Sequence, residues 1–268
     1  MLGKIATFGQ ALVMSDDSKS PHHLNPDYGL GAARRRIRLT ATAGSVEGYL
    51  VDIHHEMRCR IEHDGQVITG TSGEMVRVPT TICPGAVAVL DELVGFDLTT
   101  DPRVYYKQGR ARRHCTHLFH LGVLSAAQAC RDEAERIYDV FMADETDRPA
   151  KVEVSCNGEI VHQWQVRGGL IVSPPALAEQ PLLSGFSSWA NATFSGDMLE
   201  AAQVASQAYF VAQARRYLTD SVSGQPLSAD PDRIGACYSY AAERVDTGRF
   251  LGGNVRDFTD GIVESPPA

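Results

Sequence analysis

Alternation of apolar and polar residues in the first third of the chain constrains its fold more than any other feature. In the stretch that begins at Arg34, Ile37 and Leu39 alternate with polar residues, and a period of two is typical of a strand with one buried face. After the turn AGS, the stretch GYLVDIHHEMRCRIE places Leu50, Asp52 and His54 on one face. Asp64-Gly65 then accepts the positive φ of a type I′ turn. We expect an antiparallel meander from residue 34 to about residue 79.

A second hairpin and four helices complete the predicted fold. Asn157-Gly158 separates two alternating runs in KVEVSCNGEIVHQWQV, where His162 shares a face with Trp164 and is read as a core histidine. Helical spacing predicts helices at 84–94, ending at Gly95, at 116–144, at 196–219 after a Ser195 cap, and at 234–245. No internal repeat is visible. The sequence therefore predicts an α+β fold, with a mostly antiparallel sheet packed against several helices.

Length and charge narrow the class of protein. A chain of 268 residues with 43% hydrophobic residues fits a soluble globular protein, which we divide into an N-terminal arm, 1–33, and a single domain, 34–268. The net charge of −8 argues against nucleic-acid binding. No apolar run is long enough to span a bilayer, and the N-terminus lacks a signal-peptide core. We expect a cytoplasmic homo-oligomer with reduced, scattered cysteines.

Common catalytic signatures do not occur in the chain. GxGxxG after a strand and GxxxxGKS are missing, so nucleotide cofactors are disfavoured, and GxSxG is missing as well. The prediction is that the protein uses no cofactor.

The stretch RRHCTHLFHL, residues 112–121, is the densest group of reactive side chains, and three interpretations of it compete. A zinc site would use His114, His117 and His120 with Cys115, but steps of three residues precess by about 60° on a helix and would spread the rings. In a catalytic interpretation, Thr116 caps a helix whose positive end keeps His117 neutral and favours a thiolate at Cys115. In the third interpretation the histidines simply pack at a helix start. We predict no metal.

Other candidates flank this stretch. Asp52 and His54 lie two apart on one strand face, so the carboxylate could orient the imidazole, although a surface pair is equally common. Tyr105 could donate to a phenolate and Tyr106 could stack on an aryl ring, but one buried and one exposed tyrosine would be as ordinary. Basic side chains that could offset phenolate charge, or simply form a solvated loop, are Lys107, Arg110, Arg112 and Arg113. Phe186, Trp189 and Phe194 could wall a pocket, cover the core or join subunits. No role is assigned to His22, His23, His55 or His63.

From Arg34 to about Gln128 the sequence resembles the bacterial domain-of-unknown-function family 2889. The matching features are RRRI, the acidic position in GYLVDIH, CPGA, LVG, and CTHL followed by an AAQA-like helix end. The resemblance covers a little over a third of the chain. His114 stands where a glycine is usual and His120 where other residues are usual, so the three-histidine pattern is peculiar to this chain, which weakens the metal interpretation.

The resemblance implies a function through a connection of this family to phenylcoumaran γ-formaldehyde lyases. Such an enzyme opens the dihydrofuran ring of a lignin-derived β-5 linked aromatic dimer and releases formaldehyde to leave a stilbene. It would need acids and bases, for which His117, Tyr105, Asp52 and His54 are the candidates. Substrate contacts would come from Tyr106, Lys107, Arg110, Trp189 and Phe186. The competing expectations are a non-catalytic protein that binds aromatic or acyl groups, and an assembly protein whose motif marks a subunit contact.

Overall fold

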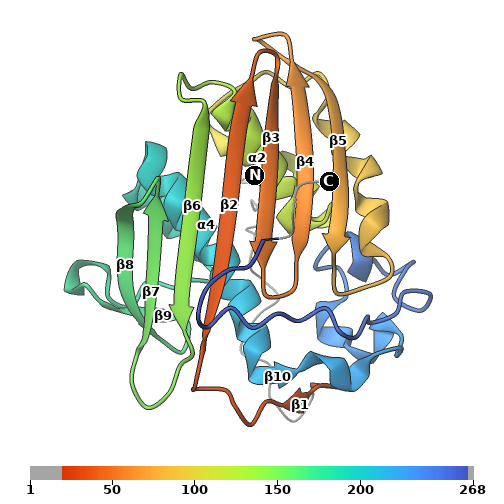
Figure 1. Ribbon diagram of the computed structural model, residues 1–268, viewed down its shortest axis with the longest axis vertical. Helices are drawn as coiled ribbons and strands as arrows, with labels where there is room; N and C mark the ends of the chain where they lie inside the picture. Colours follow the sequence, from red (N-terminus) through yellow and green to blue (C-terminus); the bar gives the residue numbers. More distant parts are fainter. Residues whose placement is uncertain (1–19, 265–268) are drawn as a thin grey trace, which may run out of the picture.

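The computed structural model describes residues 20–264, and its centre is an eight-stranded antiparallel sheet of order β5-β4-β3-β2-β6-β7-β8-β9 (Figure 1). The predicted α+β class is confirmed, as are the meander and both hairpins. The type I′ turn predicted at Asp64-Gly65 is wrong, because only Gly65 has a positive φ there, whereas Asn157 and Gly158 both have one. The strands of this sheet are β2 (Ala32–Thr42), β3 (Ser45–Asp52), β4 (Glu56–His63), β5 (Ile68–Arg77), β6 (Glu135–Ala143), β7 (Ala150–Cys156), β8 (Glu159–Arg167) and β9 (Leu170–Ser173).

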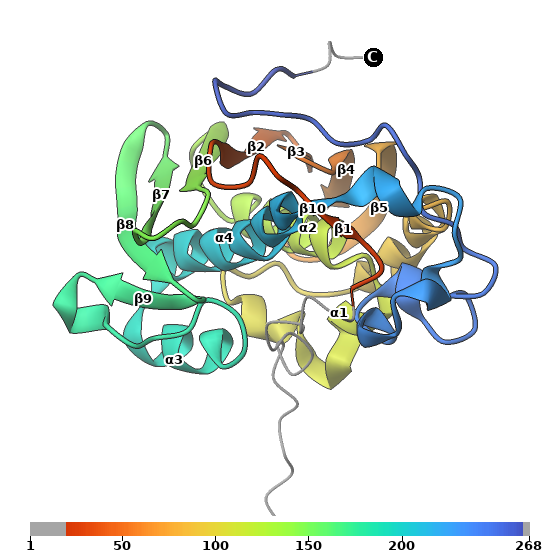
Figure 2. The same ribbon diagram turned by 90° about the horizontal axis from the view of Figure 1, so that it is seen from below.

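Helices cover one face of this sheet, and the end of the C-terminal segment, which we define as residues 219–264, crosses the other (Figure 2). The long helices are α2 (Thr116–Gln128), which packs on β3 and β4, and α4 (Gly196–Ala212), which packs on β6 and β7. The shorter ones are α1 (Arg110–Arg113) and α3 (Phe186–Thr193). A separate ribbon pairs β1 (His23–Leu24) with β10 (Tyr217–Leu218), which ties the N-terminal arm to the segment after α4.

The topology contains a repeat that the sequence does not show. Four consecutive strands followed by a long helix, β2–β5 with α2, are matched by β6–β9 with α4. The strand order is mirrored about the central β2–β6 pair, which is antiparallel. The two halves are therefore related by an approximate two-fold operation in their connectivity.

The core lies between the sheet and the two long helices. On β2, Ile37 and Leu39 are fully buried while Arg36 and Arg38 face outward, as the alternation predicts. Gly48 lets α2 approach β3 closely, because an added Cβ would lie 2.6 Å from Ser125 Oγ. The only inward-facing charged residue of β2 is Arg35, which is 1% exposed.

The predicted helix over 116–144 is wrong in its second half. It ends at Gln128, and Glu135–Ala143 form the central strand β6. Tyr138, Val140 and Met142 point inward with a period of two, as expected for a strand. Apolar residues at Ala134, Ile137 and Phe141 match helical spacing as well, so over so short a stretch the two periods are ambiguous.

Several other predicted boundaries also differ. The helix at 84–94 consists of two 3₁₀ segments, Cys83–Ala86 and Ala88–Leu93, although Gly95 ends it with a φ of +85°. The aromatic loop forms α3, α4 ends at Ala212 rather than residue 219, and 234–245 contains only the 3₁₀ turn Tyr238–Tyr240. The first 19 residues of the predicted arm lie outside the described residues.

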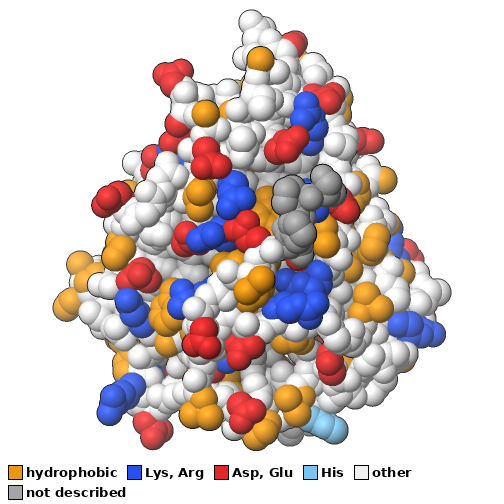
Figure 3. Space-filling view, in the orientation of Figure 1, with side chains coloured by type: hydrophobic (Ala, Val, Ile, Leu, Met, Phe, Trp, Pro, Cys, Tyr) orange, Lys and Arg blue, Asp and Glu red, His pale blue; other side chains and the backbone are white. Residues whose placement is uncertain are grey.

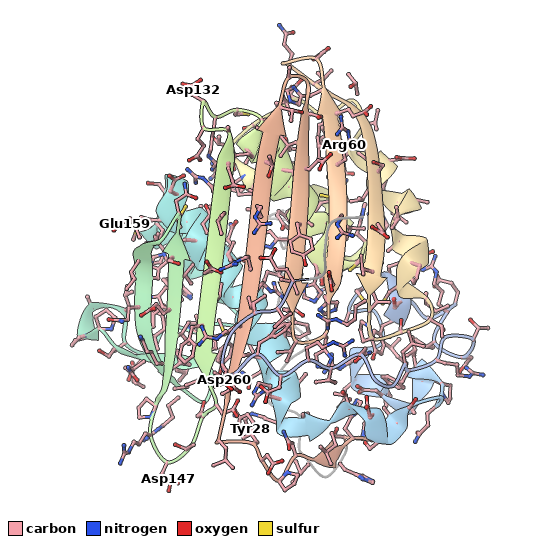
Figure 4. All side chains as sticks on the ribbon, viewed as in Figure 1. Tyr28, Arg60, Asp132, Asp147, Glu159 and Asp260 are labelled. Atoms are coloured by element: carbon pink, nitrogen blue, oxygen red, sulfur yellow. The ribbon has the colours of Figure 1, made fainter. Side chains whose placement is uncertain are left out.

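Basic and acidic side chains are interspersed on the outer face of the sheet (Figure 3). Arg36 and Arg38 both pair with Glu264 of the C-terminal segment. Figure 4 shows Arg60 on β4, and Asp132 and Asp147 near opposite ends of β6. Among residues 20–264, no helix is long and apolar enough to cross a membrane.

Candidate functional site

A cavity of about 450 Å³ lies where the β3–β4 turn, the start of α2, the α3–α4 region and the C-terminal segment meet. Its volume falls in the range of small-molecule sites. Its aromatic walls come from Phe186, Phe210, Tyr240 and Phe250. Its ionisable side chains include His54, His55, His117, Arg112 and Arg233.

The turn between β3 and β4 presents two of these histidines. β3 ends at Asp52, whose Oδ1 accepts hydrogen bonds from the backbone N–H groups of His54 at 2.9 Å and of His55 at 2.8 Å. An aspartate that bonds the backbone two and three residues onward is typical of a tight turn. The same carboxylate therefore shapes the turn and holds its histidines at the cavity.

A buried chain of paired side chains runs from the sheet to the cavity. Arg35 lies opposite Asp52 in the β2–β3 register, and its Nη2 donates to Asp52 Oδ2 at 2.7 Å. On the other side, His55 Nδ1 lies 3.0 Å from Asp52 Oδ1. Burial alone would raise the pKa of Asp52, but His55 and Arg35 outweigh it and hold that pKa well below its usual range. An ionised carboxylate only accepts, so His55 Nδ1 carries the hydrogen.

His117, in the first turn of α2, packs against this chain. Its ring centroid lies 4.3 Å from that of His55 and 6.3 Å from that of Phe210. Burial, together with His55 and Arg35, lowers the pKa of His117 well below its usual value, so the imidazole is neutral. Its Nδ1 has no hydrogen-bond partner among residues 20–264. The direction agrees with the neutral His117 expected from the sequence, but the cause is burial beside His55 and Arg35 rather than the positive helix end.

His54 faces the cavity from the other side of the turn. Its Nδ1 lies 3.4 Å from Asn254 Oδ1 of the C-terminal segment. Burial and the neighbouring His55 lower the pKa of His54 to about 4. Although Asp52 was expected to orient His54, it pairs with the side chain of His55 and contacts only the backbone of His54. The reason is that β3 ends at Asp52, so the predicted alternation of faces stops there.

The three histidines of RRHCTHLFHL point to different partners. His114 Nε2 lies 3.4 Å from Glu92, and its ring packs on Phe119. His120 is 2% exposed, and burial lowers its pKa to about 3. Within the part of the chain that the structure describes, no three His, Cys, Asp or Glu side chains are grouped as a metal would require.

Cys115 lines the cavity, but the expected thiolate is wrong. The cap position of α2 is Cys115 rather than Thr116, and no side chain makes a capping hydrogen bond there. Burial raises the pKa of the Cys115 thiol, and the nearby Cys83 and Cys237 raise it further. The thiol is therefore protonated at neutral pH.

The candidates between residues 105 and 110 lie apart from the cavity walls. Tyr105 is fully buried, and its hydroxyl donates to the Asp97 carbonyl at 3.0 Å. Tyr106 packs edge-on against Phe119. Lys107 is exposed. Arg110 donates to the Tyr105 carbonyl and lies over the Phe96 ring, so it stabilises the loop.

Of the predicted aromatic wall, one residue reaches the cavity. Phe186 lines it, whereas Trp189 Nε1 donates to the Pro181 carbonyl and its ring packs on Phe194. His162 is the predicted core histidine, 4% exposed and bonded through Nε2 to the Met198 carbonyl.

Sequence reasoning missed His55, Arg35, Arg233 and His22. The adjacent His54 and His55 could have indicated the site. In a strand His54 would share a face with Asp52, but in a turn the side chain of His55 can reach the carboxylate instead. Arg35 within RRRI was also visible, because it shares the period of Ile37 and Leu39. His22 and Arg233 reach the cavity only through the long-range packing of the arm and the C-terminal segment.

No profile of a known protein family, no curated protein and no solved structure matches this chain. The resemblance of residues 34–128 to a family therefore stays a prediction.

Proposed function

We propose that the protein is a cofactor-independent lyase that opens the ring of a lignin-derived phenylcoumaran and releases formaldehyde to leave a stilbene. The observation that carries the proposal is the neutral His117 packed against His55, which is itself bonded to Asp52, at the wall of a cavity with aromatic sides. A neutral imidazole beside an oriented imidazole–carboxylate pair is suited to moving protons.

The protein has to supply only proton transfers for this reaction. Loss of the free phenol proton pushes an electron pair through the ring, which breaks the bond from the benzylic carbon to the aryl ether oxygen and gives a quinone methide. An acid protonates the departing phenolate. A base then takes the γ-hydroxyl proton, the bond to the γ-carbon breaks, and formaldehyde leaves. The electron pair of the broken carbon–carbon bond forms the stilbene double bond and returns the quinone methide to a phenolate.

The cavity holds groups for each step. His117 is a neutral base, and His55, with Nδ1 bonded to Asp52, can exchange a proton through Nε2. His54 is a second neutral imidazole at the same wall. Arg233 supplies positive charge for a phenolate. Tyr105, Tyr106, Lys107, Arg110 and Trp189 have no role in this proposal, because none of them lines the cavity.

The alternative of a non-catalytic binding protein fits the aromatic walls but does not account for the buried charges. A pocket that only holds an aromatic ligand gains nothing from an ion pair placed beneath it, since burying charges is costly. The Arg35–Asp52–His55 chain therefore supports the catalytic proposal over the binding one.

The proposal is tested with the variant His117→Ala and the control His63→Asn, in which a half-buried histidine at the end of β4 is changed away from the cavity. We expect His117→Ala to lower the rate of stilbene formation by about 10²-fold to 10⁴-fold, as loss of a general acid or base does. His63→Asn should keep the wild-type rate. Thermal denaturation of each variant checks folding. A His117→Ala protein that is folded and fully active would remove His117 from the mechanism.

A further inference from the structure

The cavity walls carry charges of one sign. Arg112 and Arg233 line the cavity, and no aspartate or glutamate of residues 20–264 does. This contrasts with the whole chain, in which 33 acidic residues outnumber 25 lysines and arginines. An acidic protein that keeps carboxylates off one cavity creates a local site for an anion.

The two arginines differ in how far they are neutralised. Arg233 Nε lies 3.0 Å from Asp230, which sits behind the wall, so its charge is partly offset. Arg112 is exposed in α1 and has no hydrogen-bond or ion-pair partner within the described part of the chain. Its neighbour Arg113 is instead paired with Glu92 at 2.8 Å and does not line the cavity.

Besides Asp230, the carboxylate of Asp52 lies near the cavity, but it is already paired with other side chains. Asp52 is 2% exposed and paired with both Arg35 and His55. Because Asp52 is buried and does not line the cavity, it does not offset the charge of Arg112. The guanidinium of Arg112 is thus a free, planar donor at the rim of an aromatic cavity, and this geometry suits a carboxylate that accepts two parallel N–H bonds.

We propose that the ligand of this cavity is an aromatic molecule with a carboxylate group, and that Arg112 binds this carboxylate while the rings of Phe186, Phe210 and Phe250 hold the aromatic part. This deepens the proposed function and rests on its premise that the cavity is the substrate site. The lyase would then act on phenylcoumaran dimers that carry an acidic side chain in preference to neutral ones.

Calorimetric titration with two small probes tests the proposal in the full chain. The probes are 4-hydroxycinnamate and 4-hydroxycinnamamide, which share the phenol and differ only in the carboxylate. We expect the wild type to bind the carboxylate at least about tenfold more tightly, because a charge-assisted pair is worth more than a neutral hydrogen bond. The preference should shrink as salt is added, because Arg112 is exposed.

Two variants complete the test. Arg112→Gln should weaken binding of the carboxylate by about tenfold and leave binding of the amide unchanged. The matched control Arg113→Gln, on the same short helix, should change neither. Equal binding of the two probes, no binding of either, or an equal loss in Arg113→Gln would overturn the proposal. Because no turnover is measured, these results are independent of whether the protein proves to be a lyase.

Discussion

Asp52 is the residue on which the proposed site depends. It takes hydrogen bonds from two backbone N–H groups and from two charged or ionisable side chains, at the end of a strand where the chain turns. Arg35 beneath it has no other partner for its Nε and Nη1 within residues 20–264. Removing the carboxylate charge would therefore leave a guanidinium buried and unpaired.

Asp52→Asn should consequently lower both stability and activity. We expect the free energy of unfolding to fall by about 3–5 kcal/mol, the usual result of breaking a buried ion pair on one side. Urea denaturation measures this loss. In the double variant Arg35→Met/Asp52→Leu, part of the stability should return, since no charge stays unpaired, but activity should not. If the single variant Asp52→Asn is as stable as the wild type, Arg35 has found another partner.

Among the elements, the β3–β4 turn is fixed by a side chain from β5. Arg77 donates through Nη2 to the carbonyls of Asp52 and His55, and through Nη1 to those of Ile53 and Asn254. It thereby joins the turn that carries the histidines to the C-terminal segment that forms the opposite wall. Arg77 is a positioning residue, since it does not line the cavity.

Arg77→Lys should disturb the site without destroying the fold. A lysine has three donors on one point charge and cannot span four carbonyls. We expect kcat for stilbene formation to fall by about tenfold, a loss of the size that misplaced catalytic groups cause, while KM changes little. The control Arg60→Lys lies on the outer face of β4, paired with Glu47 (Figure 4). If Arg60→Lys lowers kcat as much as Arg77→Lys, the effect is not specific to the turn.

Local patterns predicted much of the sheet but little of the site. Strands β2 to β5 follow from alternation and an Asp-Gly turn, because their partners are adjacent in sequence. β6 was missed because Ile137 and Phe141 satisfy helical spacing as well. Of the residues that line the cavity, His54, His117 and Phe186 follow from local motifs. Arg233 and His22 do not, because distant irregular segments bring them to the cavity.

At the scale of the molecule, the mirrored connectivity places the two long helices on one face of the sheet, and each half carries a buried arginine on its central strand. The β2–β3 pair contributes Arg35 and Asp52. In the other half, the inward-facing Arg136 of β6 is also buried, and its Nη1 lies 2.8 Å from Asp197 and 3.6 Å from Glu200 of α4. Both halves therefore carry buried charged side chains, and both contribute to the cavity: the β3–β4 turn presents His54 and His55, and α4 presents Phe210 and Val211.

The neutral buried histidines make stability depend on pH. His54 and His120, with pKa values lowered to about 4 and about 3, stay neutral at pH 5 in the folded protein. In the unfolded chain the same groups titrate near pH 6.5 and take up protons below it. The unfolded state then binds more protons, so stability falls as the pH decreases from 6.5, by about 2 kcal/mol for each such histidine at pH 5.

Urea denaturation at pH 7 and pH 5 measures this dependence. His120 does not line the cavity, and its Nε2 has no hydrogen-bond partner among residues 20–264. In His120→Gln the loss of unfolding free energy between pH 7 and pH 5 should therefore be smaller than in the wild type by the contribution of one histidine. The cavity side chains are unchanged in this variant. Equal stability of the wild type at the two pH values would mean that these histidines are charged in the folded protein.

We propose that acid–base groups of this cavity, without a cofactor, convert a phenylcoumaran to a stilbene and formaldehyde. The most direct measurement is to incubate the wild-type protein, dialysed against a chelator and with no cofactor added, with a racemic phenylcoumaran dimer, and to quantify both products. We expect stilbene and formaldehyde to appear together in equal amounts. If neither product forms from the racemate, which contains both enantiomers, or if stilbene forms without formaldehyde, the proposed reaction is wrong.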